Sequence, residues 1–180
     1  MIAPTQTFPV ELVGNAELYD RVVENGILNA RSRVWIATAN LKDMHVQRAR
    51  GFRPILSVFD ELSRGGVSFR IIHSAMPSRS FQATLEEFPV LTGGGLELQI
   101  CPRSHWKMVI VDNVFAYLGS ANFTGAGLGV KRPHRRNLEL GVTSTDPSWV
   151  GHLASIFDTF WIGEHCANCG HRTRCPDPIA

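Results

Sequence analysis

The chain has 180 residues, of which 44% are hydrophobic and 19% charged, and this composition is typical of a soluble globular protein. No stretch approaches the roughly 18 apolar residues that a membrane-spanning helix needs, and residues 1–14 lack the basic start and apolar run of a signal peptide, so we expect a cytoplasmic protein. The net charge of +2 is too small by itself to indicate a nucleic-acid partner.

The expected elements, taken in chain order, alternate between helices and strands. Residues 15–30 have apolar positions at helical spacing, and residues 33–40 form a short apolar run that is typical of a buried strand. There follow a helix at 54–64, a strand at 67–73, a helix at 80–88, a strand at 96–101, a hairpin within 106–117, a strand at 138–143 and a helix at 149–161. This order predicts an α/β domain over residues 1–163, a mixed β-sheet flanked by helices, with an appended tail at 164–180.

The first strand of the hairpin carries two polar residues. Alternate side chains of a strand share a face, so His105 and Lys107 project together, about 7 Å apart along the chain, while Trp106 points the other way. Two such groups on an apolar strand are costly unless an anion satisfies them, which favours a phosphate site. By the same parity Asp112 lies on the opposite face from His105, and we interpret it as structural.

Two further pairs of polar residues follow at the same spacing. Ser120 and Asn122 share one face and can donate hydrogen bonds to a phosphoryl oxygen. Asn137 and Glu139 form the other pair, and the Glu139 carboxylate is expected to accept a proton from a histidine ring and so fix its tautomer.

Together these residues read His-x-Lys-x4-Asp, then Gly-Ser-x-Asn, then Asn-x-Glu between His105 and Glu139. This pattern resembles the signature of the phospholipase D superfamily, and the resemblance implies that family's fold. It also implies a metal-independent phosphodiesterase in which His105 attacks phosphorus and forms a covalent phosphohistidine. Lys107, Ser120 and Asn122 would stabilise charge on the phosphoryl oxygens, and a second histidine would protonate the leaving alcohol.

The sequence does not directly identify the second histidine that the resemblance implies. The family's site uses two such motifs, and this chain has one, because its six other histidines lack the following Lys and Gly-Ser-x-Asn. A two-fold homodimer brings two copies of His105 to one site, and two-fold dimers are the commonest oligomers. We therefore expect a homodimer.

The four cysteines of the chain suggest a metal site in the tail. Cys166, Cys169 and Cys175 have metal-ligand spacing, and the fourth ligand is expected to be Cys101, or alternatively His171 or His165. A structural zinc is favoured. The alternative is a [4Fe–4S] cluster, since the spacing resembles the iron–sulfur staple of some CRISPR-associated and recombination nucleases.

The substrate is expected to be nucleic acid, with DNA favoured over RNA. A basic run lies between Asn122 and Asn137, so its loop should open near the site and neutralise backbone phosphates; its candidate binding residues are Lys131, Arg132, Arg135 and Arg136. We therefore predict an endonuclease. Two alternatives remain: a phospholipid hydrolase or phosphatidyl transferase, and a non-catalytic nucleic-acid-binding subunit of a bacterial defence or DNA-modification system.

Overall fold

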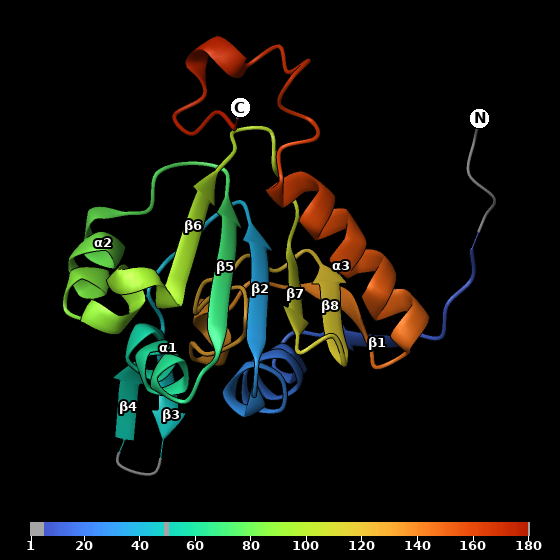
Figure 1. The fold of residues 1–180 in the computed structure, drawn as a ribbon. Coiled ribbons are helices and arrows are strands. Elements are labelled where there is room, and N and C mark those ends of the chain that lie inside the picture. Colours follow the sequence, from blue (N-terminus) through green and yellow to red (C-terminus); the bar gives the residue numbers. More distant parts are fainter. Residues whose placement is uncertain (1–5, 49–50, 180) are drawn as a thin grey trace.

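The fold is built around one twisted, mixed β-sheet. A computed structural model describes residues 6–48 and 51–179 of the chain. Seven strands lie in the order β1-β9-β8-β7-β2-β5-β6, and the second, two-stranded sheet pairs β3 with β4 (Figure 1). The expected mixed sheet with flanking helices is confirmed.

The parallel half of the sheet follows from helical crossovers. β2 (Arg33–Thr38) pairs in parallel with β5 (Ser68–His73), and β5 pairs in parallel with β6 (Leu96–Ile100). The connections carry α1 (Ile55–Arg64) and α2 (Arg79–Glu86). α1 ends where Gly65 and Gly66 remove the side chains that favour helix, as the sequence predicts.

The antiparallel half contains the hairpin that carries the signature residues. β7 (Met108–Val111) and β8 (Phe115–Gly119) form this hairpin, β7 lies against β2, and β8 lies against β9 (Leu140–Ser144). β1 (Glu11–Gly14) completes this edge beside β9. β1 and the hairpin of β3 (His45–Arg48) and β4 (Gly51–Pro54) are absent from the sequence prediction.

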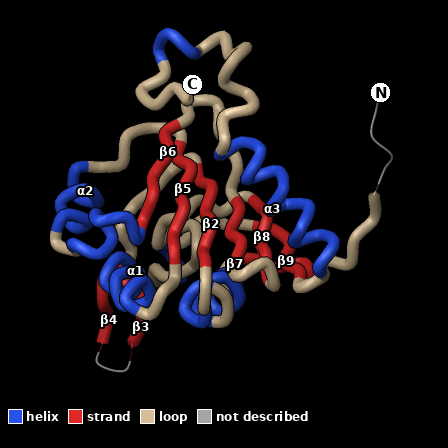
Figure 2. The backbone as a smooth tube through the Cα atoms, viewed as in Figure 1, coloured by secondary structure: helices blue, strands red, loops and turns tan. Residues whose placement is uncertain are grey.

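Two hydrophobic layers cover the sheet. α3 (Pro147–Trp161) packs over one face, where Phe157 stacks on Trp35 with ring centroids 5.0 Å apart. The other face buries the larger cluster, which includes the α1 residues Leu56 and Phe59. Figure 2 shows α3 lying against β7 and β8.

The prediction of one regular helix at residues 15–30 is wrong. The segment forms a short π-helical turn, Tyr19–Glu24, and a 3-10 turn, Ile27–Asn29, separated by Gly26. A Cβ atom at Gly26 would lie 2.5 Å from the Val22 carbonyl oxygen, so the glycine permits a close turn that ends the first helical piece. Val22, Val23 and Ile27 are nevertheless buried, as the apolar spacing predicts.

The tail beyond α3 folds back over the sheet. It includes one 3-10 turn, Arg172–Arg174, and lies over the edge at which β2, β5 and β6 end (red in Figure 1). The Asp177 carboxylate accepts a hydrogen bond from the Ile100 backbone N–H at 3.1 Å, which ties the tail to the end of β6. None of the helices among residues 6–48 and 51–179 has the length and apolarity to cross a bilayer.

Candidate active site

His105 and Lys107 lie in the segment that leads into β7. The regular strand begins only at Met108, but the Lys107 carbonyl oxygen still accepts a hydrogen bond from the Gly119 N–H at 3.1 Å, so the strand pairing continues to Lys107. Met108 and Ile110 are buried beneath α3. The predicted alternation therefore holds, and the His105 and Lys107 side chains belong to the other face. The Lys107 Nζ atom lies 3.4 Å from His105 Nδ1 and donates to the His105 carbonyl oxygen at 3.0 Å.

Ser120, Asn137 and Glu139 form one hydrogen-bonded group. The Ser120 hydroxyl donates to Glu139 Oε2, and the Asn137 amide donates to Oε1 at 2.9 Å. Ser120 Oγ also accepts from the Leu140 N–H at 3.1 Å, which fixes the hydroxyl at the start of β9. Both Glu139 oxygens therefore have donors from the same chain, and its partner here is Ser120 in place of the expected histidine.

A threonine that the sequence analysis missed positions Asn122. Thr38, the last residue of β2, is buried, and its hydroxyl lies 3.4 Å from Asn122 Oδ1 and 3.0 Å from the Asn40 carbonyl oxygen. The same hydroxyl accepts from the Phe123 N–H at 2.9 Å. Because the Asn122 oxygen faces Thr38, its amide N–H groups are left to donate to a ligand. The only signal was a polar residue directly after the apolar run at residues 34–37.

Two glycines of the signature region make room for a buried tyrosine. Gly119 and Gly141 face each other across β8 and β9. A Cβ atom on Gly141 would lie 2.5 Å from Cε2 of Tyr117, so the ring fits only against a bare backbone. Burial raises the pKa of Tyr117, although a hydrogen bond from the Ala121 N–H to its hydroxyl oxygen, at 3.1 Å, opposes the rise. This contact shapes the turn that carries Ser120.

Asp112 lies at the opposite end of the hairpin and has the structural role expected of it. Its carboxylate accepts hydrogen bonds from the backbone N–H groups of Arg31, Ser32 and Arg33 at 2.7–2.8 Å, and from the Ser32 hydroxyl at 2.8 Å. Partial burial would raise the pKa of Asp112, but these donors outweigh it and the pKa is lowered. Asp112 joins the hairpin to the start of β2.

The predicted phosphate-binding residues surround a short 3-10 turn, Pro133–Arg135, in the loop before β9. This loop is anchored to the segment after Asn122, because the Lys131 N–H donates to the Gly125 carbonyl oxygen at 3.0 Å and the Asn137 N–H to that of Ala126 at 3.1 Å. The side chains of Lys131, Arg132 and Arg135 are exposed, and that of Arg136 is half-buried. The loop therefore lies next to the segment that follows Asn122, and its role in binding phosphates stays a prediction.

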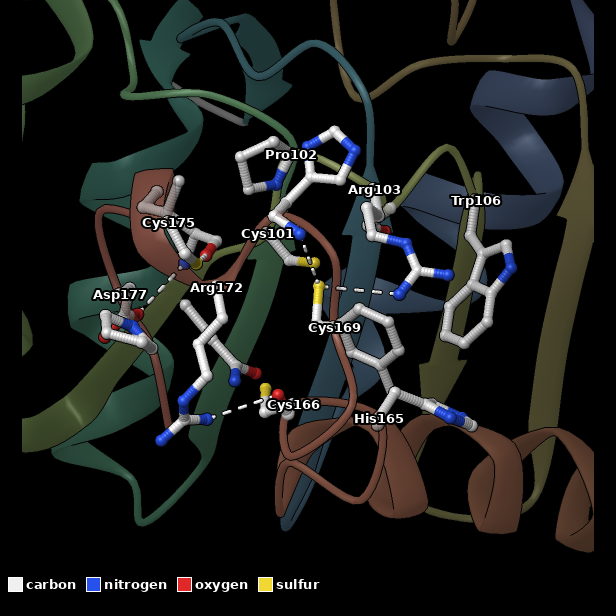
Figure 3. Close-up of a pocket in the computed structure, with 16 residues that line it drawn as sticks. Cys101, Pro102, Arg103, Trp106, His165, Cys166, Cys169, Arg172, Cys175 and Asp177 are labelled. Carbon is white, nitrogen blue, oxygen red and sulfur yellow. Dashed lines mark hydrogen bonds between the residues drawn. The ribbon is translucent and has the colours of Figure 1, made fainter. Parts of the chain in front are cut away.

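The metal prediction is not supported. All four cysteines and both tail histidines do line one cavity of about 260 Å³ between the tail and the loop before His105 (Figure 3): Cys101, Cys166, Cys169, Cys175, His165 and His171. However, the described residues contain no group of three or more His, Cys, Asp or Glu side chains that could hold a metal ion.

The surroundings of the thiols give the physical reason. Cys169 Sγ accepts from the Arg103 guanidinium at 3.5 Å and from the His171 backbone N–H at 3.4 Å, and these donors lower the pKa of Cys169. Cys175 Sγ is directed instead to the Ile100 carbonyl oxygen, 3.9 Å away. The Arg103 guanidinium and the Ile100 carbonyl oxygen therefore engage two of the thiols separately, and the described cysteines do not converge on one point.

The comparisons with known proteins concern the fold and the family. The solved structure of NucT from Helicobacter pylori shares the fold with a TM-score of 0.61 and 16% sequence identity, over 85% of this chain and 95% of that one. Nuc from Salmonella typhimurium, a phospholipase D family member, matches with a TM-score of 0.61 and 19% identity, over 96% of this chain and 99% of that one. TrmBL2, an archaeal chromatin protein, matches with a TM-score of 0.56 and 14% identity, over 89% of this chain and 55% of that one. No protein of curated function matches the sequence. A family model described as cardiolipin synthase, PLD-like domain, matches residues 23–161. With the signature residues gathered at one end of the hairpin and most of the chain matched, this protein belongs to the phospholipase D superfamily.

Proposed function

We propose that the protein is a nuclease that hydrolyses phosphodiesters of DNA through a covalent phosphohistidine at His105, without a catalytic metal. The observation that carries the proposal is the convergence of the signature's polar side chains beside an exposed basic loop. Ser120 and Asn122 are each held by a neighbour, Glu139 and Thr38 respectively, so their positions are fixed before a substrate arrives. The loop from Lys131 to Arg136 supplies charge for neighbouring phosphates.

The reaction proceeds in two displacements. A neutral ring nitrogen of His105 attacks phosphorus, the bond from phosphorus to the leaving oxygen breaks, and a second histidine gives that oxygen its proton. Water then transfers a proton to the second histidine and attacks phosphorus, and the phosphorus–nitrogen bond breaks. The Lys107 ammonium and the Asn122 amide stabilise the negative charge on the phosphoryl oxygens in both steps.

We infer that the second histidine comes from another copy of the chain, because no other histidine of this chain carries the signature. His73, the one buried histidine among the described residues, uses both ring nitrogens internally: Nε2 accepts from the Leu41 N–H at 2.9 Å, and Nδ1 contacts the Ala75 carbonyl oxygen. The two chain neighbours of Glu139 are exposed leucines, since Leu138 is 93% exposed and Leu140 57%. Large exposed apolar residues beside a half-site support a two-fold interface there.

Phosphatidyl transfer is the second candidate, and a specific observation favours it. The matching family is described by its cardiolipin synthase members, and the exposed leucines beside Glu139 suit a lipid as well as a second subunit. The basic loop favours nucleic acid, because a polyanion contacts several cations at once.

The test compares nucleic acids and lipids under chelation. The wild type, His105→Ala and the matched surface control His152→Ala are incubated in excess EDTA with end-labelled single- and double-stranded DNA, with RNA, and with phosphatidylglycerol vesicles. We expect DNA cleavage by the wild type and the control, and none by His105→Ala. Products from vesicles alone would replace the nuclease by the lipid enzyme, and DNA binding without any turnover would leave a binding subunit.

The dimer has a separate test. Leu138→Asp places a charge in the proposed interface, so sedimentation should show a monomer, and cleavage should be lost although the fold is retained. A monomeric wild type that cleaves DNA would refute the shared site.

A further inference from the structure

A second cavity, of about 450 Å³, lies directly against the candidate catalytic residues. Its wall includes Asn137, whose amide donates to Glu139 at 2.9 Å, and Asn40, whose carbonyl oxygen accepts from the Thr38 hydroxyl that also contacts Asn122. A group bound here is therefore separated from Ser120 only by Asn137 and Glu139, and from Asn122 only by Asn40 and Thr38. The volume is within the range of small-molecule sites.

The cavity contains an exposed aromatic ring. Phe52 lies on β4 in the small hairpin, and its side chain is 66% exposed. A phenyl ring exposed at the mouth of a polar cavity gains free energy when an apolar surface covers it. Nucleobases stack on such rings, and each stacked base contributes about 1–3 kcal/mol.

The same cavity is lined by the half-buried carboxylate of Asp43, whose oxygens are not all paired. The Asp43 Oδ1 atom is buried and has no hydrogen-bond partner among the described residues. Burial raises the pKa of Asp43, with smaller opposing effects from His45 and nearby backbone N–H groups. Every base carries an N–H donor on its pairing edge, which a lipid chain lacks.

Two lysines of the lining provide the charge that a nucleotide requires. Lys42 and Lys131 are exposed, and neither forms an ion pair with the described acidic residues. The Lys42 N–H donates to the Phe123 carbonyl oxygen at 3.2 Å, and the Lys131 N–H to that of Gly125, so both walls are fixed to the segment that carries Asn122. A base inside the cavity would have these ammonium groups near its phosphates.

We propose that this cavity binds the nucleobase next to the scissile phosphate of a single-stranded nucleic acid, stacked on Phe52 and hydrogen-bonded to Asp43. This inference rests on the proposed nuclease function and adds its strand preference. A paired base must leave its stack to enter, which costs a few kcal/mol, so duplexes are cleaved more slowly than single strands. Stacking is tolerant of sequence, so every base is accepted.

The experiment compares Phe52→Ala with Val114→Ala, an equally exposed apolar residue in the turn of the β7–β8 hairpin. Both variants and the wild type are given a single-stranded oligonucleotide, the same oligonucleotide with one abasic site, and a small diester of two abasic deoxyribose units joined by one phosphate, which has neither a base nor an aromatic ring. Phe52→Ala should lower kcat/KM on the intact oligonucleotide about 10-fold, as expected from the loss of one stacked base, and leave the small diester unchanged. The wild type should cleave the phosphate next to the abasic site about 10-fold more slowly than the same bond in the intact strand.

The outcomes separate this inference from the proposed function. If Phe52→Ala cleaves the intact strand as Val114→Ala does, or loses equal activity on the small diester, the base site is refuted while the nuclease stands. If no protein cleaves either substrate, the nuclease proposal fails. Affinity for the single strand, measured by fluorescence anisotropy, then decides the base site alone, because Phe52→Ala should bind about 10-fold more weakly than Val114→Ala.

Discussion

Removal of the Asp112 carboxylate should destabilise the protein without changing its chemistry. The carboxylate accepts four hydrogen bonds, from three successive backbone N–H groups and the Ser32 hydroxyl. Each such bond contributes about 1 kcal/mol net after competition with water. Asp112 also adopts a φ of 52°, which asparagine tolerates and alanine does not without about 1 kcal/mol of strain. Asp112→Asn should therefore cost about 2 kcal/mol, and Asp112→Ala about 4 kcal/mol or more.

The dependence on pH follows from the lowered pKa. Because the folded-state pKa of Asp112 is below its ordinary value of 3.8, its stabilisation is fully present above pH 3.8 and is lost as the pH falls through the folded-state pKa. Urea unfolding at pH 7 and in a series below pH 4 measures the difference between wild type and Asp112→Asn. The difference should be largest at pH 7 and should shrink in acid.

Activity provides the decisive control. His105 precedes Asp112 by seven residues of extended chain, about 20 Å, so folded Asp112→Asn should retain the kcat of the wild type. A folded Asp112→Asn variant with kcat reduced 100-fold would refute the structural interpretation, and so would a stability equal to wild type at pH 7.

Three further changes test other parts of the fold. Gly141→Ala introduces a Cβ atom 2.5 Å from the Tyr117 ring, so thermal or urea unfolding should show a loss of about 2–3 kcal/mol. Glu139→Gln removes the charge that holds Ser120, and kcat should fall about 100-fold with KM little changed; an unchanged kcat would contradict this role. His73 is buried and its pKa is lowered chiefly by that burial, so the unfolded state binds its proton first and stability should fall as the pH drops below 6.5. Replacement of His73 by Gln should flatten that part of the stability curve.

The sequence predicted the elements whose pattern depends on burial. β2 is apolar over residues 34–37, and β5 contains the buried apolar residues Phe69, Ile71 and Ile72, so both strands can be predicted without knowledge of tertiary contacts. β1, β3 and β4 have four residues each, and most of their side chains are not buried, so no run marks them. The break at Gly26 depends on the proximity of the Val22 carbonyl oxygen, a contact that spacing along the chain does not reveal.

The candidate site shows the same division. The alternation of His105 and Lys107 with Met108 follows from strand geometry and could be read from the sequence. Thr38 could not, because it comes from a strand more than 60 residues earlier in the chain. The cysteine spacing predicted a metal site. It could not reveal the contact between Cys169 and Arg103, because Arg103 belongs to a segment more than 60 residues earlier in the chain.

The hydrogen bonds of the Asp112 carboxylate to residues 31–33 also determine the register in which β7 pairs with β2. β7 pairs Val111 with Val34, and the next N–H, that of Asp112, donates to the Arg33 carbonyl oxygen at 3.0 Å. A slip of one residue would turn every side chain of the strand to the other face, directing Lys107 under α3 and Met108 out toward the substrate. The hairpin turn at Asp112 therefore sets the register of β7, and with it the face of the sheet on which the proposed catalytic side chains lie at the other end of the hairpin.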